Sequence, residues 1–128
     1  MNQKTAELEA ISNTIDLYVQ GVRNGDVEML RKAFHPKAMM YTMSANGPAT
    51  IEIEGLYAFV SSNDAPVKTG EPHRCFISSI QHSGSAASVE MTEEAAFGND
   101  YTNYFHLLKI DGNWTIVSKT YNVITQKN

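Results

Sequence analysis

Residues 104–119 read YFHLLKIDGNWTIVSK, and this stretch decides the fold. Two runs rich in aromatic and branched apolar residues flank the pair Asp111-Gly112. A two-residue hairpin loop needs positive φ angles, which Asp-Gly adopts readily, so the pair predicts a tight β-hairpin. Because the loop length fixes which residues face each other, the pairing register of both strands is predicted as well.

Other extended segments lie next to this hairpin along the chain. Together with it, the expected strands cover residues 73–81, 86–97, 101–110 and 113–125. Ser83-Gly84-Ser85 and Gly98-Asn99-Asp100 separate them and are typical turn sequences. Short links between consecutive strands indicate an antiparallel meander.

The N-terminal part of the chain has a helical period instead. Between residues 8 and 22 the apolar side chains recur at intervals of three and four, at Leu8, Ile11, Ile15, Tyr18, Val19 and Val22. Asn24-Gly25 is expected to end this helix, and Asp26 to cap a short second helix that reaches Phe34. His35-Pro36 then stops it, because proline disfavours helical backbone in the residue before it.

Shorter elements fill the middle of the chain. We expect a strand over residues 38–43, a turn at 46–48, a strand over 50–53, a helix around 56–60 and a loop over 63–72. Helices first and hairpin-linked strands after them predict an α+β fold, with helices packed on a curved antiparallel sheet. The 128 residues, 42% of them apolar, suit a single domain over 1–128.

Charge and composition exclude several classes of function. The formal net charge is −4 and the basic residues are scattered singly, so the basic patch of a nucleic-acid-binding protein is absent. Apolar runs are far shorter than the roughly 20 residues that span a bilayer, so no membrane segment is expected. With no signal sequence and one cysteine, the expected location is the cytoplasm, although a trimmed secreted form would look the same.

The expected strand 101–110 carries large apolar side chains on both faces. Tyr104, Leu108 and Ile110 lie on one face, and Phe105 and Leu107 lie on the other. A sheet with one face in water alternates more cleanly between apolar and polar residues. Since few helices are available, another copy of the chain is the expected cover, and we predict a homodimer joined through the sheet.

The combined pattern resembles the NTF2-like superfamily. The resemblance depends on Phe34-His35-Pro36-Lys37-Ala38 and on the 104–119 hairpin, and it covers nearly the whole chain. Within the superfamily the chain is similar to the branch labelled putative lumazine-binding, near the SnoaL-like proteins. The resemblance implies a cone-shaped α+β fold with a cavity at its open end, commonly as a homodimer. Its members include isomerases, dehydratases, polyketide cyclases and binding or assembly domains, so membership does not choose a function.

Candidate site residues were sought as pairs that could move protons. Isomerase-type relatives combine an acidic or histidine base with a tyrosine that stabilises an enolate in a dry pocket. His106 is the candidate base, with Tyr41 or Tyr104 as the oxyanion donor. The alternative is that the tyrosines fill core volume and that His106 is a core or dimer-contact residue. Asn103 stands where many relatives of this branch carry an aspartate, and an amide cannot act as a base.

The leading hypothesis is a small organic molecule bound in an aromatic-lined pocket. The residues expected to line it are Tyr18, Phe34, Tyr41, Phe59, Tyr104, His106 and Lys119. Lys119 could hold an anionic group, or it could pair with one of the adjacent glutamates, Glu93 and Glu94, which alternation places on opposite faces. Solvation of this strand end is the alternative for both glutamates. The competing hypotheses are an isomerase, dehydratase or cyclase, and a non-catalytic assembly module without a deep cavity.

Metal and cofactor binding are not expected. The four histidines lack His-x-His and His-Glu-x-x-His spacing, and no glycine-rich phosphate-binding motif is present. Cys75 reads as a small buried apolar residue. A nucleophilic Cys-His pair would require His73 or His106 to lie next to Cys75 in space.

Overall fold

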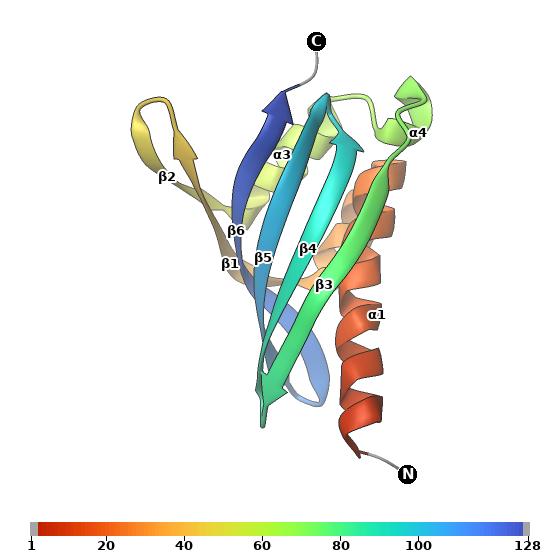
Figure 1. The fold of residues 1–128 in the computed structure, drawn as a ribbon, viewed down its shortest axis with the longest axis vertical. Helices are drawn as coiled ribbons and strands as arrows, with labels where there is room; N and C mark the ends of the chain where they lie inside the picture. Colours follow the sequence, from red (N-terminus) through yellow and green to blue (C-terminus); the bar gives the residue numbers. More distant parts are fainter. Residues whose placement is uncertain (1–2, 127–128) are drawn as a thin grey trace.

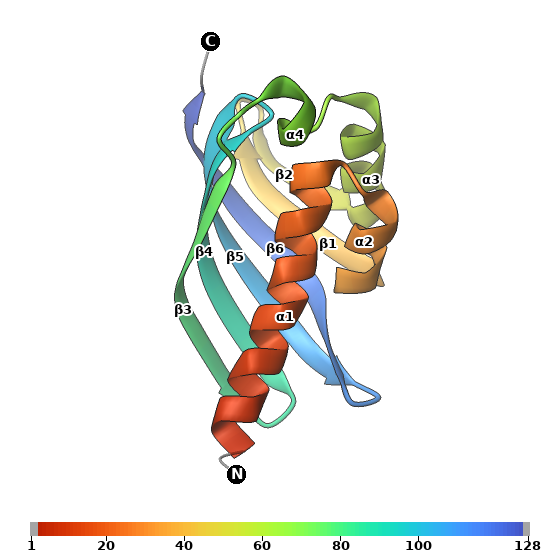
Figure 2. The same ribbon diagram turned by 90° about the vertical axis from the view of Figure 1, so that its right-hand side faces the viewer.

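The computed structural model describes residues 3–126. Its helices are α1 Gln3–Asn24, α2 Val27–Ala33, α3 Ile53–Ser62 and α4 Pro66–Thr69. Its strands are β1 Phe34–Ser44, β2 Gly47–Glu52, β3 Arg74–Ser83, β4 Ala86–Ala96, β5 Asn99–Ile110 and β6 Asn113–Gln126. The helices cover the concave face of one strongly bent sheet (Figures 1 and 2). The expected α+β fold, with helices on a curved sheet, is confirmed.

The six strands follow the order β2-β1-β6-β5-β4-β3. Neighbouring strands are antiparallel except β1 and β6, which run parallel, so the sheet is mixed rather than purely antiparallel. The parallel pair joins strands from opposite ends of the chain, for example Phe34 with Ile116. Turn sequences predict pairing only between strands that follow each other in the chain, so they could not predict that β1 pairs with β6.

Several predicted local features are confirmed. Asp111 and Gly112 have φ angles of 50° and 83°, and Ile110 pairs with Asn113 on either side of them. Asp26 caps α2, since its side chain accepts a hydrogen bond of 3.1 Å from the Met29 amide. The hairpin therefore forms at the predicted turn, and its register holds as far as the Leu107–Ile116 pair, after which it shifts by one residue.

Several element boundaries differ from the prediction; Ile53, for example, was expected in a strand but begins α3. Two of the differences have a clear local cause. The helix expected to include Phe34 ends at Ala33, and Phe34 instead opens β1 with extended backbone, its amide bonding the carbonyl of Leu30. Within the expected loop 63–72, Pro66 begins the short helix α4, because its fixed φ suits the first helical position.

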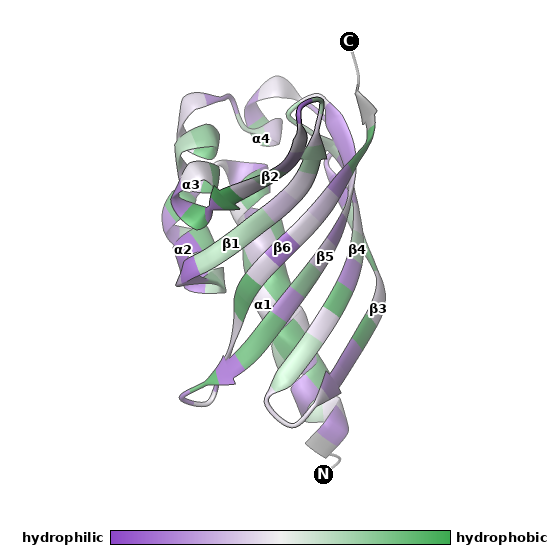
Figure 3. Ribbon diagram, turned by 90° about the vertical axis from the view of Figure 1, so that its left-hand side faces the viewer, coloured by the Kyte–Doolittle hydropathy of each residue, from purple (hydrophilic) through white to green (hydrophobic). Residues whose placement is uncertain are grey.

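The core fills the space between α1 and the concave face of the sheet. Its fully buried side chains come from the helices and from the inward positions of β4, β5 and β6, and they include Ile11, Ile15, Leu30, Ile53, Met91, Phe105, Leu107 and Ile116. Burying one such side chain stabilises the fold by about 1.5–3 kcal/mol. Hydrophobic and hydrophilic residues alternate along the strands (Figure 3), as expected when one face is buried. None of the helices within residues 3–126 is both long and apolar enough to cross a membrane.

Candidate functional site

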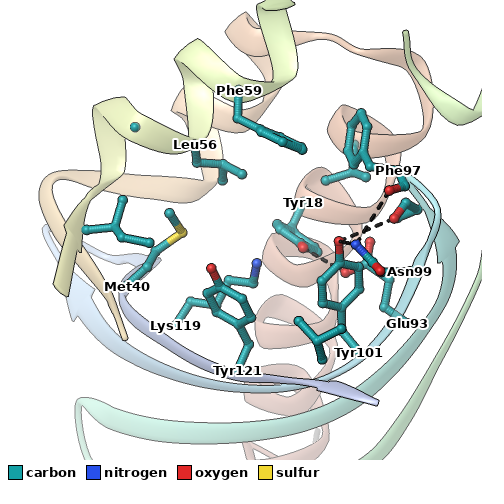
Figure 4. A pocket seen from close by; sticks show the side chains of 15 residues that line it. Tyr18, Met40, Leu56, Phe59, Glu93, Phe97, Asn99, Tyr101, Lys119 and Tyr121 are labelled. Carbon is teal, nitrogen blue, oxygen red and sulfur yellow. Dashed lines mark hydrogen bonds between the residues drawn. The ribbon is translucent and has the colours of Figure 1, made fainter. Parts of the chain in front are cut away.

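A cavity of about 340 Å³ lies between α1, α3 and the concave face of the sheet (Figure 4). Its walls are mainly apolar, with Val22, Met40, Ile51, Leu56, Phe59 and Phe97 among them. Its polar lining residues are Tyr18, Glu93, Asn99, Tyr101, Lys119 and Tyr121. An apolar recess with a few convergent polar groups is the usual form of a small-molecule site.

Glu93 is the most deeply buried charged group at this cavity, with 1% of its surface exposed. It shares the inward face of β4 with Met91, while Glu94 points outward into solvent. One carboxylate oxygen accepts hydrogen bonds from the Tyr18 hydroxyl at 2.7 Å and from the Asn103 amide at 2.9 Å. The other oxygen accepts one from His73 Nε2 at 2.8 Å. Three donors therefore compensate the carboxylate for its loss of water.

These contacts hold Glu93 in its ionised form. Burial alone would raise the pKa of Glu93, but hydrogen bonds from His73 and Tyr18 and the nearby charge of Lys119 outweigh it, so its pKa lies below the usual value. Burial, together with the neighbouring Glu93 charge, raises the pKa of Tyr18 well above its usual value. Tyr18 thus remains a hydrogen-bond donor.

Arg23 determines which nitrogen of His73 carries the proton. Its Nε donates to His73 Nδ1 at 3.1 Å, and its Nη2 donates to the His73 carbonyl at 3.2 Å. Since Nδ1 accepts a hydrogen bond, the proton of a neutral imidazole is on Nε2, where it faces Glu93. This chain of contacts links α1 to β4 through His73, the residue that precedes β3.

Lys119 enters the cavity from β6 and has 6% of its surface exposed. Its Nζ lies 4.5 Å from the ring centre of Tyr121 and 5.2 Å from that of Tyr18. Among residues 3–126, no oxygen accepts a hydrogen bond from this ammonium group. Burial lowers the pKa of Lys119, and the charge of Glu93 opposes that shift only in part. The structure therefore directs an unpaired cation into the cavity.

A β-bulge gives Lys119 its inward direction. His106 pairs with Ser118 but the next residue, Leu107, pairs with Ile116, so Val117 is an extra residue in β6. Without it, strict alternation from the buried Ile116 would place Lys119 on the outer face of the sheet.

Only some of the predicted pocket residues meet at the cavity. Tyr18, Phe59 and Lys119 line it. Phe59 lies at the side of the opening with its ring edge-on to Phe97, at 4.9 Å between ring centres. Phe34 is buried, 6.1 Å from Tyr18 between ring centres, and does not line the cavity.

The placement of Tyr41, Tyr104 and His106 in the pocket requires correction. All three lie on the convex face, where Tyr41 is 40% and Tyr104 is 45% exposed and His106 faces the Ser118 hydroxyl. The buried positions of β5 are odd-numbered, including Asn103, Phe105 and Leu107, so Tyr104 and His106 point away from the helices. The sequence gives the alternation of β5 but not which face the helices cover.

The role of Glu93, for which solvation of this strand end was an open alternative, was not predicted from the sequence. The spacing of Val89, Met91 and Glu93 on one strand face was the available signal, since two apolar inward neighbours indicate a buried third position. Asn103 also belongs to the site, because its amide donates a hydrogen bond to Glu93. Tyr101 and Tyr121 line the cavity as well and were not predicted to do so.

His73, Cys75 and Glu93 form a cluster whose donor atoms all lie within 4.8 Å of one another. His73 Nε2 already donates to Glu93, and Nδ1 already accepts from Arg23, so this imidazole has no free lone pair for a metal. Burial raises the pKa of the Cys75 thiol far above its usual value, although the thiol lies 3.6 Å from His73. Since the thiolate is the nucleophile and metal ligand, the cluster suits a hydrogen-bonded core better than either role.

Comparison with solved structures defines the class of protein. An NTF2-like protein of unknown function from Shewanella baltica OS155 is 26% identical, with a TM-score of 0.89 and coverage of 98% of this chain and 100% of that one. Another from Methylobacillus flagellatus KT is 25% identical, with a TM-score of 0.84 and coverage of 94% of each chain. The protein has the NTF2-like fold. It belongs to the family described as "putative lumazine-binding", whose sequence model matches residues 6–122.

One curated protein with an assigned activity is also similar. Aldolase FrzH from a Cladobotryum species is 25% identical over 119 residues, which cover 92% of each chain. The alignment thus spans almost the full length of both proteins.

Proposed function

We propose that the protein binds a small organic molecule in the cone cavity, with an apolar ring system against the walls and a carbonyl or anionic oxygen directed at Lys119. The observation that carries this proposal is the unpaired Lys119 ammonium, which is buried and lies at the cavity. A buried charge without a hydrogen-bond acceptor is unfavourable unless a ligand supplies one. The family description agrees with small-molecule binding.

The walls of the cavity support the same class of ligand. Leu56, Phe59 and Phe97 offer apolar and aromatic surface on the helical side and at the β4–β5 turn. Flat ring systems stack well against such side chains. A cavity of this kind favours a ligand-binding role over an assembly role, for which no deep recess is needed.

Titration calorimetry with lumazine and with 2-naphthoate tests the proposal. We expect both to bind, and we expect Lys119→Met to weaken the binding of 2-naphthoate about tenfold or more, because it removes a charge-assisted hydrogen bond. Lys109→Met is the matched control, since Lys109 pairs with Glu7 away from the cavity lining. Equal 2-naphthoate affinity in the wild type and in Lys119→Met would refute the assigned role of Lys119.

A second candidate function is an enzyme that acts on a carbonyl compound. The full-length similarity to an aldolase favours it. In this candidate, solvent water takes the proton from the carbon next to the carbonyl, Lys119 stabilises the negative charge that develops on the carbonyl oxygen, and the anionic Glu93 stabilises the cationic Lys119. Its test is proton exchange at the methyl group of 2-acetylnaphthalene in deuterated water, followed by NMR. The wild type should accelerate the exchange and Lys119→Met should not.

We also propose that two copies pair through the convex face of the sheet. Exposed apolar side chains gather there on β1, β3 and β5, including Tyr41, Phe76, Tyr104 and Leu108. A partner copy would remove this apolar surface from water. This face is opposite to the cavity, so ligand binding and pairing involve separate surfaces.

A further inference from the structure

The ε-amino groups of Lys119 and Lys109 have different surroundings. Lys119 Nζ lies 5.2 Å from the ring centre of Tyr18 and 4.5 Å from that of Tyr121, and Leu56 lines the same cavity (Figure 4). Lys109, by contrast, donates to both carboxylate oxygens of Glu7 at 2.8 and 3.0 Å. A neutral amine suits the first environment and an ammonium ion suits the second.

We propose that Lys119 forms a covalent imine with an aldehyde or ketone held in the cone cavity. The inference rests on the proposed function, which places a carbonyl oxygen beside Lys119, and it adds the substrate class and the bond formed. Lysine becomes a nucleophile toward carbonyl carbon when an apolar pocket removes its ammonium group from water.

Charged and titratable groups approach Lys119 from each element around it. Tyr18 comes from α1, Glu93 from β4, Tyr101 from β5 and Tyr121 from β6. Glu93 carries the only full negative charge among these described neighbours, and its oxygens already accept from Tyr18, Asn103 and His73. It therefore moderates the lowering of the Lys119 pKa without receiving the ammonium proton.

Tyr121 provides a hydroxyl group for the reacting oxygen. Among residues 3–126 its hydroxyl has no hydrogen-bond partner, and in Figure 4 it points to the same side as the Lys119 nitrogen. Burial raises the pKa of Tyr121, so the hydroxyl stays protonated and can donate to a carbonyl oxygen. The mainly apolar walls offer water few hydrogen-bond partners beside the imine, which disfavours its hydrolysis.

The proposed step conserves atoms and electrons. The neutral amine of Lys119 attacks the carbonyl carbon, and the π electrons move onto oxygen, which takes a proton to give a carbinolamine. The attacking nitrogen also loses a proton, which leaves the carbinolamine neutral. Its lone pair then forms the C=N bond as hydroxide leaves, and the remaining N–H proton passes to the hydroxide to give water. One amine and one carbonyl compound thus give one imine and one water, without oxidation or reduction of the protein.

Reductive trapping tests the step. The protein is incubated with 2-naphthaldehyde and sodium cyanoborohydride, which delivers hydride to the imine carbon and leaves a stable secondary amine. Intact mass should show one dominant adduct, and peptide mapping should place it on Lys119. Labelling there should exceed that of the exposed Lys37 and Lys68 about tenfold or more, because a larger neutral fraction of a desolvated lysine is available near pH 7. Excess 2-naphthalenemethanol, which is expected to fill the cavity but has no carbonyl, should suppress the labelling of Lys119.

Two variants complete the experiment. Lys119→Arg keeps the positive charge but cannot form an imine, so the dominant adduct should disappear while 2-naphthoate still binds. Lys109→Met should label like the wild type. Labelling spread evenly over the surface lysines would overturn the inference. If 2-naphthoate binds in a Lys119-dependent way without an adduct, the imine alone fails; if neither naphthyl probe occupies the cavity, the proposed function fails too.

Discussion

Glu93 and Glu94 are adjacent in sequence and have opposite environments. Replacing Glu93 by Gln removes the charge and turns an amide donor toward either His73 or the Tyr18–Asn103 pair of donors. We expect a loss of about 3 kcal/mol in unfolding free energy, because buried donors lose their acceptor. Glu94→Gln, on the exposed side of the same strand, should change it by less than about 0.5 kcal/mol. Urea denaturation at pH 7 measures both, and equal effects would contradict the assigned network.

The lowered pKa of Glu93 also predicts how stability changes in acid. Above its ordinary value of 4.5, Glu93 is ionised in both the folded and the unfolded chain, so its contribution is complete. As the pH falls below 4.5, the unfolded chain takes up the proton first, and stability then decreases until the folded carboxylate is protonated too. The unfolding free energy of Glu93→Gln should therefore fall less steeply with acid than that of the wild type. Parallel curves would show that Glu93 is not held ionised.

We expect the buried amino group of Lys119 to lower the free energy of unfolding. The lowered pKa means that the fold disfavours the ammonium form relative to water. Replacement by Met keeps a similar length without the charge, and we expect the unfolding free energy at pH 7 to rise by about 1 kcal/mol. Lys109→Met loses the partly exposed pair with Glu7 and should be neutral or slightly destabilising. A less stable Lys119→Met variant would show that the amine is already well paired.

At the scale of elements, Gly21 sets the approach of α2 to α1. A Cβ at this position would lie 2.7 Å from Leu30 side-chain atoms, and Leu30 is fully buried. Alanine improves helix propensity by about 1 kcal/mol, whereas overpacking costs about 1–3 kcal/mol. Gly21→Ala should therefore destabilise by about 1 kcal/mol, as measured by thermal unfolding.

Shortening Leu30 provides the control for this close approach. Once Leu30→Ala is present, the added methyl group of Gly21→Ala has room, so the two changes together should cost less than the sum of the single changes. Strict additivity would show that the two positions do not crowd each other.

The sequence predicted elements better than it predicted faces. Asp111-Gly112 and Asp26 act through their own neighbours, so their roles could be read from adjacent residues. Tyr104 was assigned to the cavity because alternation gives two faces without saying which one the helices cover. The bulge at Val117 and the parallel β1–β6 pair depend on distant strands, and no local pattern reports them.

The same distinction applies to the site. Tyr18 and Lys119 could be assigned from residue type and position, and both line the cavity. The environment of Glu93 could not be predicted in this way, because its donors come from α1, from His73 just before β3 and from β5, and they meet only in the folded protein.

At the scale of the whole molecule, pairing through the convex face is open to direct measurement. Sedimentation velocity at micromolar concentration should show a dimer. Leu108→Glu should weaken pairing about a hundredfold by placing a charge in the apolar contact. Val67→Glu, at an exposed apolar residue on α4, should leave the dimer intact. A wild-type chain that sediments as a monomer would contradict the proposal.

The position of β6 affects how the molecule is assembled during synthesis. This strand lies between β1 and β5, yet it follows the other five described strands in the sequence. A ribosome therefore releases β1–β2 and the β3–β5 meander as separate pieces, each with an unpaired edge where β6 will insert. The sheet is then completed only when β6 inserts between β1 and β5. A chain that stalls before residue 113 therefore exposes two unpaired strand edges that are prone to aggregation.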